Sequence, residues 1–167
     1  MSYSKDVIAD LIAGTLPWDQ TKRIMSAFKD SDRFDVYLAV LQDQVGWAES
    51  ILLPIGEHLY IVQKGRERIV KCDCGQEFGP YTTNWKLSAL VYVRDSKDKF
   101  AELYPGWKSP DPSLQEIREF ICPGCGTLLE VEAVPPGYPI TFDFLPDLAG
   151  FYADWLGRPL PADQPDI

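Results

Sequence analysis

The first third of the chain has the hydrophobic period of helices. Four apolar residues share one face of a predicted helix, at positions i, i+4, i+7 and i+11: Phe34, Leu38, Leu41 and Val45. Asp32 precedes this stripe and is expected to cap the helix. Two shorter helical patterns come earlier, at about 5–13, ending at Gly14, and at about 20–28. The pattern therefore predicts a helical N-terminal segment over residues 1–50.

Residues 51–134 have the shorter period of strands. In chain order, the predicted strands are 59–62, 68–70, 87–93, 117–121 and 127–134. Lys64-Gly65 predicts a tight turn between the first two strands, and 53–56 is expected to form a loop. Residues 95–104 predict a short helix, closed by Pro105-Gly106. This middle part is thus predicted to be mainly β-structure.

The last predicted strand alternates between apolar and acidic residues. Leu129, Val131 and Ala133 alternate with Glu130 and Glu132. Alternation with a period of two is typical of a strand with one exposed face. We therefore expect the two glutamates to lie on the solvent face.

The final segment, residues 135–167, begins with a proline-rich arm. Prolines and a glycine within 135–139 exclude a regular helix and predict an extended path. A helix is expected next, with one apolar face made by Leu148, Phe151, Tyr152 and Trp155. Gly157 and Pro159 end it. The residues from 159 onward are expected to be loose or to lie on a partner.

Composition and charge narrow the class of protein. The chain has 16 basic and 25 acidic residues, a formal net charge of −9, and 46% hydrophobic residues. The hydrophobic content is high enough to build a core, but the chain lacks the excess of basic over acidic residues that is typical of proteins that bind nucleic-acid phosphates. No apolar run approaches the ~20 residues of a membrane span, and the N-terminus lacks a signal-peptide pattern. We expect a cytoplasmic protein with no membrane partner.

The four cysteines form two motifs, each followed by glycine. Cys72 and Cys74 make C-x-C-G, and Cys122 and Cys125 make C-x-x-C-G. Both pairs follow predicted strands, and the glycines let the backbone curl so that its amides point at the sulfurs. Four thiolates can surround one Zn²⁺ tetrahedrally at about 2.3 Å, which leaves no position open for a substrate water. The motifs therefore predict a structural rather than a catalytic zinc site.

The fold class follows from these elements. We predict an α+β protein with a helical N-terminal part, a central zinc-ribbon-like antiparallel sheet, and a C-terminal helix with a proline-rich arm, in one compact unit. Residues 75–121 form an unusually long spacer between the cysteine pairs, but loop-closure entropy grows only with the logarithm of length. Disulfides, buried thiols and a redox dithiol are the alternatives for the cysteines.

No independent active site is predicted. His58 is the only histidine, and we expect it to serve packing or the surface. Motifs of hydrolases, nucleotide-binding loops and metalloproteases are not found, so neither catalytic nor cofactor-binding residues are assigned. Aromatic and proline-rich stretches at 84–86, 105–107 and 135–139 are loop-like. Because aromatic residues are enriched in interface anchors, we expect these stretches to grip another subunit.

Several longer motifs resemble one family. They are CDCG at 72–75, NWKLSA at 84–89, VRD at 93–95, CPGCGTL at 122–128, and GFY with WLG within 150–157. In this order they resemble the small gamma subunit of acetone carboxylase and the similar subunit of acetophenone carboxylase. The resemblance covers nearly the whole chain.

The resemblance implies a function that the residues alone do not. Such a subunit binds zinc, here through Cys72, Cys74, Cys122 and Cys125, and holds together a hetero-oligomer with larger, hydantoinase-like subunits. Those partners use ATP, and in acetone carboxylase a manganese site, to carboxylate a ketone with bicarbonate to a β-keto acid. The alternatives are a free-standing zinc-ribbon adaptor or nucleic-acid binder, and a dithiol oxidoreductase.

Overall fold

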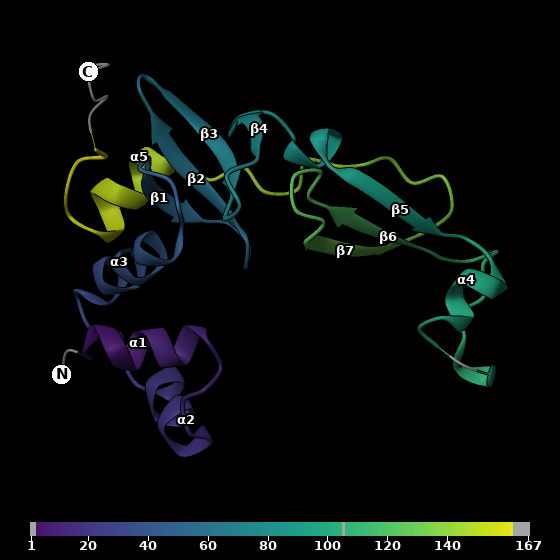
Figure 1. Ribbon diagram of the computed structural model, residues 1–167, viewed down its shortest axis with the longest axis horizontal. Coiled ribbons are helices and arrows are strands. Elements are labelled where there is room, and N and C mark those ends of the chain that lie inside the picture. Colours follow the sequence, from purple (N-terminus) through teal and green to yellow (C-terminus); the bar gives the residue numbers. More distant parts are fainter. Residues whose placement is uncertain (1–2, 105, 162–167) are drawn as a thin grey trace.

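The computed structural model describes residues 3–104 and 106–161 and has the form of an elongated arch (Figure 1). The helices are α1 (Lys5–Ile12), α2 (Trp18–Ser26), α3 (Arg33–Gln44), α4 (Lys97–Ala101) and α5 (Leu148–Gly150). The strands are β1 (Ser50–Pro54), β2 (Leu59–Lys64), β3 (Glu67–Cys72), β4 (Glu77–Pro80), β5 (Leu90–Arg94), β6 (Glu116–Ile121) and β7 (Leu128–Val134). Within the described residues the strands form two antiparallel sheets, ordered β1-β2-β3-β4 and β5-β6-β7. The predicted α+β fold is confirmed.

The N-terminal helices pack on the first sheet through α3. Leu41, on the predicted apolar stripe, is buried against Tyr60 and Val62 of β2. Asp32 does occupy the N-cap position of α3, but its side chain makes no capping hydrogen bond, so the expected capping was wrong. Its backbone angles, φ −96° and ψ 0°, lie outside the extended region that brings an N-cap side chain onto the first helical amides.

The first sheet begins one strand earlier than predicted. Leu53 and Pro54, expected in a loop, are the last residues of β1. A bulge between Ile51 and Leu53 precedes the proline, which lies on an edge strand where a missing N–H removes no necessary ladder bond. The predicted turn between β2 and β3 is confirmed, and Gly65 takes a positive φ of 55° there.

The second sheet is preceded by a turn that shortens its predicted first strand. Residues 87 and 88, expected in the strand, belong to a 3-10 turn, Trp85–Ser88. The side chain of Asn84 accepts a hydrogen bond from the Lys86 N–H and so stabilises the turn in place of a strand. The predicted short helix is present as α4, and a second 3-10 turn, Gly106–Lys108, follows it. Pro105 lies outside the described residues.

The glutamates of β7 do not lie on the solvent face as expected. Glu130 and Glu132 are partly buried, whereas Val131 is 52% exposed. The ammonium group of Lys86 lies 2.6 Å from a carboxylate oxygen of each glutamate, so both carboxylates point toward this buried lysine instead of into solvent. The prediction was wrong because alternation fixes which residues share a face, but not which face is covered.

The C-terminal arm returns the chain to the first sheet. Residues 135–147 have no regular structure, as expected, and lead to α5 and a π-helix, Phe151–Trp155 (Figure 1). The hydroxyl of Tyr152 donates a 2.9 Å hydrogen bond to the Leu52 carbonyl and fixes this helix on β1. Of the end expected to be loose from residue 159 onward, Leu160 packs against the core, and residues 162–167 lie outside the described residues.

One of the hydrophobic clusters in the described residues contains side chains of both sheets. The ring of Trp85 packs edge-to-face on Phe78 of β4 and on Phe120 of β6, with centroid distances of 5.9 and 6.0 Å. Trp85 and its neighbours in 84–86 are therefore buried, and the expectation that this stretch grips another subunit was wrong. Among the described residues, no helix is both long and apolar enough to cross a membrane.

Candidate metal centre

The first cysteine pair lies at the tip of the β3–β4 hairpin. Cys72 is the last residue of β3, and its N–H and C=O bond to the Gln76 carbonyl and the Gly75 N–H, at 2.8 and 2.9 Å. Cys74 lies in the turn that these bonds close. Gly75 has φ 97°, a conformation that other residues rarely adopt, which accounts for glycine in C-x-C-G.

The second pair repeats this arrangement at the tip of the β6–β7 hairpin. The N–H of Cys122 bonds to the Thr127 carbonyl and its C=O to the Gly126 N–H, both at 2.9 Å. Cys125 lies in the turn, and Gly126 has φ 77°. The predicted strands 117–121 and 127–134 are confirmed as the two sides of this hairpin, and the predicted role of the glycine is confirmed as well.

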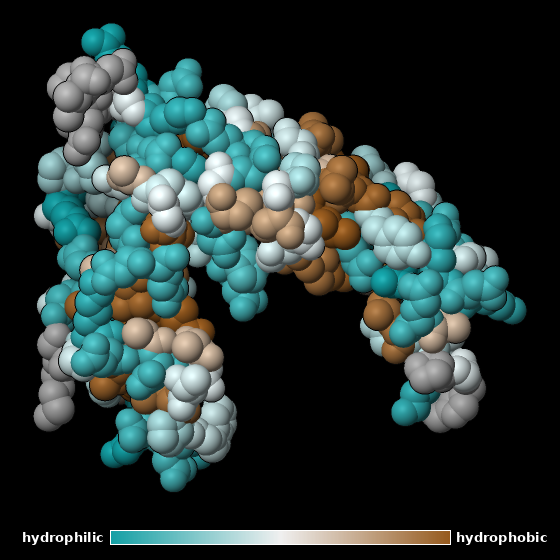
Figure 2. Space-filling model, in the orientation of Figure 1, coloured by the Kyte–Doolittle hydropathy of each residue, from teal (hydrophilic) through white to brown (hydrophobic). Residues whose placement is uncertain are grey.

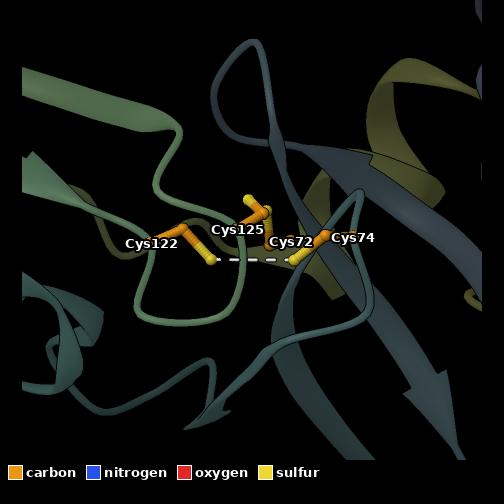
Figure 3. Close-up of side chains that lie close together, drawn as sticks. All are labelled: Cys72, Cys74, Cys122 and Cys125. Carbon is orange, nitrogen blue, oxygen red and sulfur yellow. Dashed lines mark hydrogen bonds between the residues drawn. The ribbon is translucent and has the colours of Figure 1, made fainter.

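The two hairpin tips meet and bring the four sulfurs together (Figure 3). Cys72 Sγ lies 4.0 Å from Cys125 Sγ, and Cys74 Sγ lies 3.7 Å from Cys122 Sγ. All four sulfurs lie within 4.8 Å of one another. Ligands about 2.3 Å from a tetrahedral ion are about 3.8 Å apart, whereas a disulfide requires about 2.05 Å. The spacing suits a four-coordinate metal ion, and all four cysteines are free.

Backbone amides and a hydroxyl point at the sulfurs. Cys72 Sγ and Cys74 Sγ each accept the N–H of the residue two positions later. Burial nevertheless raises the pKa of both thiols. Cys125 differs, because hydrogen bonds from the hydroxyl and N–H of Thr127 lower its pKa to about 7. A bound cation is what makes buried thiols deprotonate, so this donor set fits a divalent, thiolate-preferring ion such as Zn²⁺.

A polar cluster supports the first hairpin tip from outside. Asp73, between the two cysteines, binds His58 through Oδ2 and Nδ1 at 2.6 Å, and its carbonyl accepts the Trp47 indole N–H at 3.0 Å. The indole ring in turn lies 4.8 Å from Lys71 Nζ. His58, expected to serve packing or the surface, is partly buried, and its contact with Asp73 was not predicted. No spacing signal links His58 to Asp73, because the register between β2 and β3 decides their contact.

Lys86 organises a second cluster that sequence reasoning missed. Its side chain has no exposed surface, and Nζ contacts Glu130, Glu132 and Asp143 at 2.6, 2.6 and 3.0 Å. Burial alone would lower the pKa of Lys86, but hydrogen bonds to the three carboxylates outweigh it and raise the pKa. Asp143 belongs to the C-terminal arm, so Lys86 ties that arm to the second sheet. The ammonium group takes the place that a metal cation could occupy between these carboxylates.

The fold and the site define a class of protein: an α+β chain whose two antiparallel sheets meet at a group of four cysteines. A family model described as acetone carboxylase gamma subunit matches residues 45–156. The chain belongs to this family, which confirms the resemblance drawn from its motifs.

The chain is also similar to two individual curated proteins. It is 45% identical over 163 residues to the acetone carboxylase gamma subunit of Xanthobacter autotrophicus, a match that covers 96% of this chain and 97% of that relative. It is also 36% identical over 78 residues to the acetophenone carboxylase beta subunit of Aromatoleum aromaticum. The second match covers 46% of this chain and 60% of that relative.

Proposed function

We propose that this chain is a non-catalytic, zinc-binding structural subunit of a multi-subunit, ATP-dependent ketone carboxylase. The enzyme would join a ketone, such as acetone or acetophenone, to bicarbonate and form a β-keto acid. The observation that carries the proposal is the 45% identity to an acetone carboxylase gamma subunit over 96% of the chain.

The sulfur geometry supports the zinc part of the proposal. Cys72, Cys74, Cys122 and Cys125 would supply four thiolates to one Zn²⁺ and so close its coordination shell. A closed shell stabilises structure but leaves no site for an activated water. Because each sheet contributes one pair, the ion would join the two sheets rather than pin a single one.

The large partners would supply the chemistry. Hydantoinase-like subunits would bind ATP, the ketone and any further catalytic metal, and the assembly would be cytoplasmic. Within this chain, 1–50, 51–134 and 135–167 would act as a helical part, a β part and an arm of one unit. The net charge of −9 favours a protein partner over nucleic acid.

Native purification tests the proposal. The protein would be isolated from its own cells, its native mass measured, and each co-purifying chain identified. We expect this 18.9 kDa chain to migrate with larger carboxylase subunits in a complex that carboxylates a ketone only when ATP is present. A stable, lone species of its own mass would contradict the subunit role and favour a free-standing adaptor.

A further inference from the structure

Natural sheets protect their edge strands against pairing with other chains, and the first sheet shows this at both edges. β1 contains Pro54 and a bulge, and the Ile51 N–H is bonded by the Gln42 side chain of α3. β4 is four residues long and contains Gly79 and Pro80. Proline, bulges, short length and a covering helix all oppose the addition of another strand.

The two edges of the second sheet differ from each other. β7 carries Glu130 and Glu132 and has a bulge opposite Phe120 and Ile121. β5 has the sequence LVYVR, and three consecutive apolar side chains, Leu90, Val91 and Tyr92, are 57%, 37% and 37% exposed. Hydrophobic side chains gather over the second sheet in Figure 2. Among the edge strands in the described part of the chain, β5 alone has no proline, bulge or acidic side chain within it.

The backbone of β5 offers unpaired groups at this edge. Lys99 Nζ binds the Val93 carbonyl at 2.8 Å from outside the sheet, so this carbonyl points away from β6. The Cys122 N–H bonds to the Thr127 carbonyl on the β7 side of β6. Because backbone N–H and C=O groups of successive residues point to opposite sides of a strand, those of Phe120 point to β7 and those of Ile121 point to β5. Both observations place the N–H and C=O of Val91 outward. Among residues 3–104 and 106–161, no backbone group pairs with them.

We propose that the open edge of β5 receives an extended segment of another subunit, which adds to the second sheet as a fourth strand. Main-chain hydrogen bonds to Val91 and to the Val93 N–H would fix its register. Leu90 and Tyr92 on one face, and Val91 on the other, would contact alternate apolar side chains of the segment. This inference rests on the proposed function, because the segment belongs to a larger subunit of the carboxylase.

Charge argues for a different chain rather than a second copy of this one. The whole chain carries −9, so two copies would bring equal net charges together, which opposes association. Near the end of β5, Asp95 and Glu102 are already paired with Lys99 and Arg94, so these acids do not call for basic residues in the occupant. The occupant that fits Leu90, Val91 and Tyr92 is an apolar segment of a larger subunit that does not share this negative charge.

Two matched proline variants test the inference in the assembled complex. Val91→Pro removes an outward N–H of β5 and leaves the ladder to β6 intact. Val131→Pro makes the same change on β7, where the register with β6 also directs the Val131 N–H outward. Both variants would be co-expressed with the large subunits that co-purify with the wild-type chain. Circular dichroism and zinc content would confirm that each variant folds.

We expect Val91→Pro to weaken the retention of the large subunits about tenfold or more, and Val131→Pro to leave it unchanged. Hydrogen-exchange mass spectrometry gives a second readout without mutation. The peptide over 89–94 should exchange more slowly in the complex than in the isolated chain, while the peptide over 129–134 should not change.

Three results would overturn the inference. Val91→Pro could assemble as well as wild type, both prolines could weaken assembly equally, or Val91→Pro could only dissociate a homodimer of this chain. In each case the wild-type complex still forms, so the proposed function stands. If the wild-type chain has no large partner at all, the proposed function fails first and this inference fails with it.

Discussion

Cys74 Sγ lies 3.7 Å from Cys122 Sγ, although the two residues belong to hairpins of different sheets. The other close sulfur pair, Cys72 and Cys125, also crosses between the sheets. An ion held by all four sulfurs would therefore act as a cross-link between the two halves of the arch. Its loss is expected to loosen their arrangement more than the fold of either half.

Close packing of the hairpin tips predicts an effect of Gly124→Ala on metal binding. A Cβ at Gly124 would lie 3.0 Å from Gln76 Cβ and 3.4 Å from Cys74 Sγ, so one hairpin must move. We expect zinc affinity to fall on the order of tenfold, the size typical of changes next to metal ligands. Competition with a chromophoric chelator measures this. Gly46→Ala is the control, because its Cβ would meet nothing within 4 Å; equal affinities for both variants would contradict the prediction.

The second contact between the sheets is Trp85, and its removal should cost stability. Trp85→Ala deletes a buried ring that packs on Phe78 and Phe120. We expect a loss of about 3–5 kcal/mol in the free energy of unfolding, measured with urea. Trp155→Ala, at a side chain 83% exposed, should change stability by less than about 0.5 kcal/mol. Similar losses in the two variants would show that Trp85 does not join the sheets.

The sequence predicted the strands on both sides of Cys122 and Cys125, and the strand that leads to Cys72, because these signals are local. The glycines after both motifs have the positive φ that the motif requires. β4, which completes the first hairpin, was not predicted, because its four residues include Gly79 and Pro80 and show no strand pattern. Local patterns did not indicate that Trp85 is buried. Its segment has no periodic neighbours, and its burial depends on two sheets that meet only in three dimensions.

Lys86 gives a further prediction about stability. Lys86→Met leaves Glu130, Glu132 and Asp143 without their shared cation. Glu132 is 87% buried by side-chain area and would keep only Arg118, at 4.0 Å, as a cationic partner. We expect the free energy of unfolding, measured with urea, to fall by about 3 kcal/mol. This is the lower end of the range for a broken buried ion pair, because two of the three carboxylates are partly exposed. Lys64→Met breaks the exposed pair with Glu77 and should have little effect. An unaffected Lys86→Met protein would contradict a structural role for this cluster.

Glu49 predicts a dependence of stability on pH. The hydrogen bond from Lys71 lowers the pKa of Glu49 in the folded protein, so the unfolded state takes up the proton more readily. The stabilisation is present above the unfolded pKa of about 4.3 and is lost as the pH falls through the lower folded value. The stability difference between wild type and Glu49→Gln, under about 1 kcal/mol, should therefore shrink from pH 6 to pH 3. Urea titrations of both proteins at each pH cancel shared effects such as metal loss. A difference that grows on acidification would contradict this sign.

Long-range pairing limited what the sequence could say about Lys86 and His58. Lys86 meets Glu132 and Asp143 across 46 and 57 positions, and His58 meets Asp73 across 15. Alternation along β7 correctly placed Glu130 and Glu132 on one face. The position of the Lys86 ammonium group decides which face of β7 is exposed to solvent, and the hydrophobic periodicity of the sequence does not indicate that position.

The metal content of the purified chain tests the central claim most directly. Wild-type protein and Cys125→Ser would be prepared without chelators, and zinc per chain measured by plasma mass spectrometry alongside titration of accessible thiols. We predict one zinc ion per wild-type chain and less than a tenth of that in Cys125→Ser, because three thiolates and a hydroxyl hold zinc poorly. A zinc-free wild-type protein with four reactive thiols, or full zinc in Cys125→Ser, would contradict the four-cysteine site that joins the sheets.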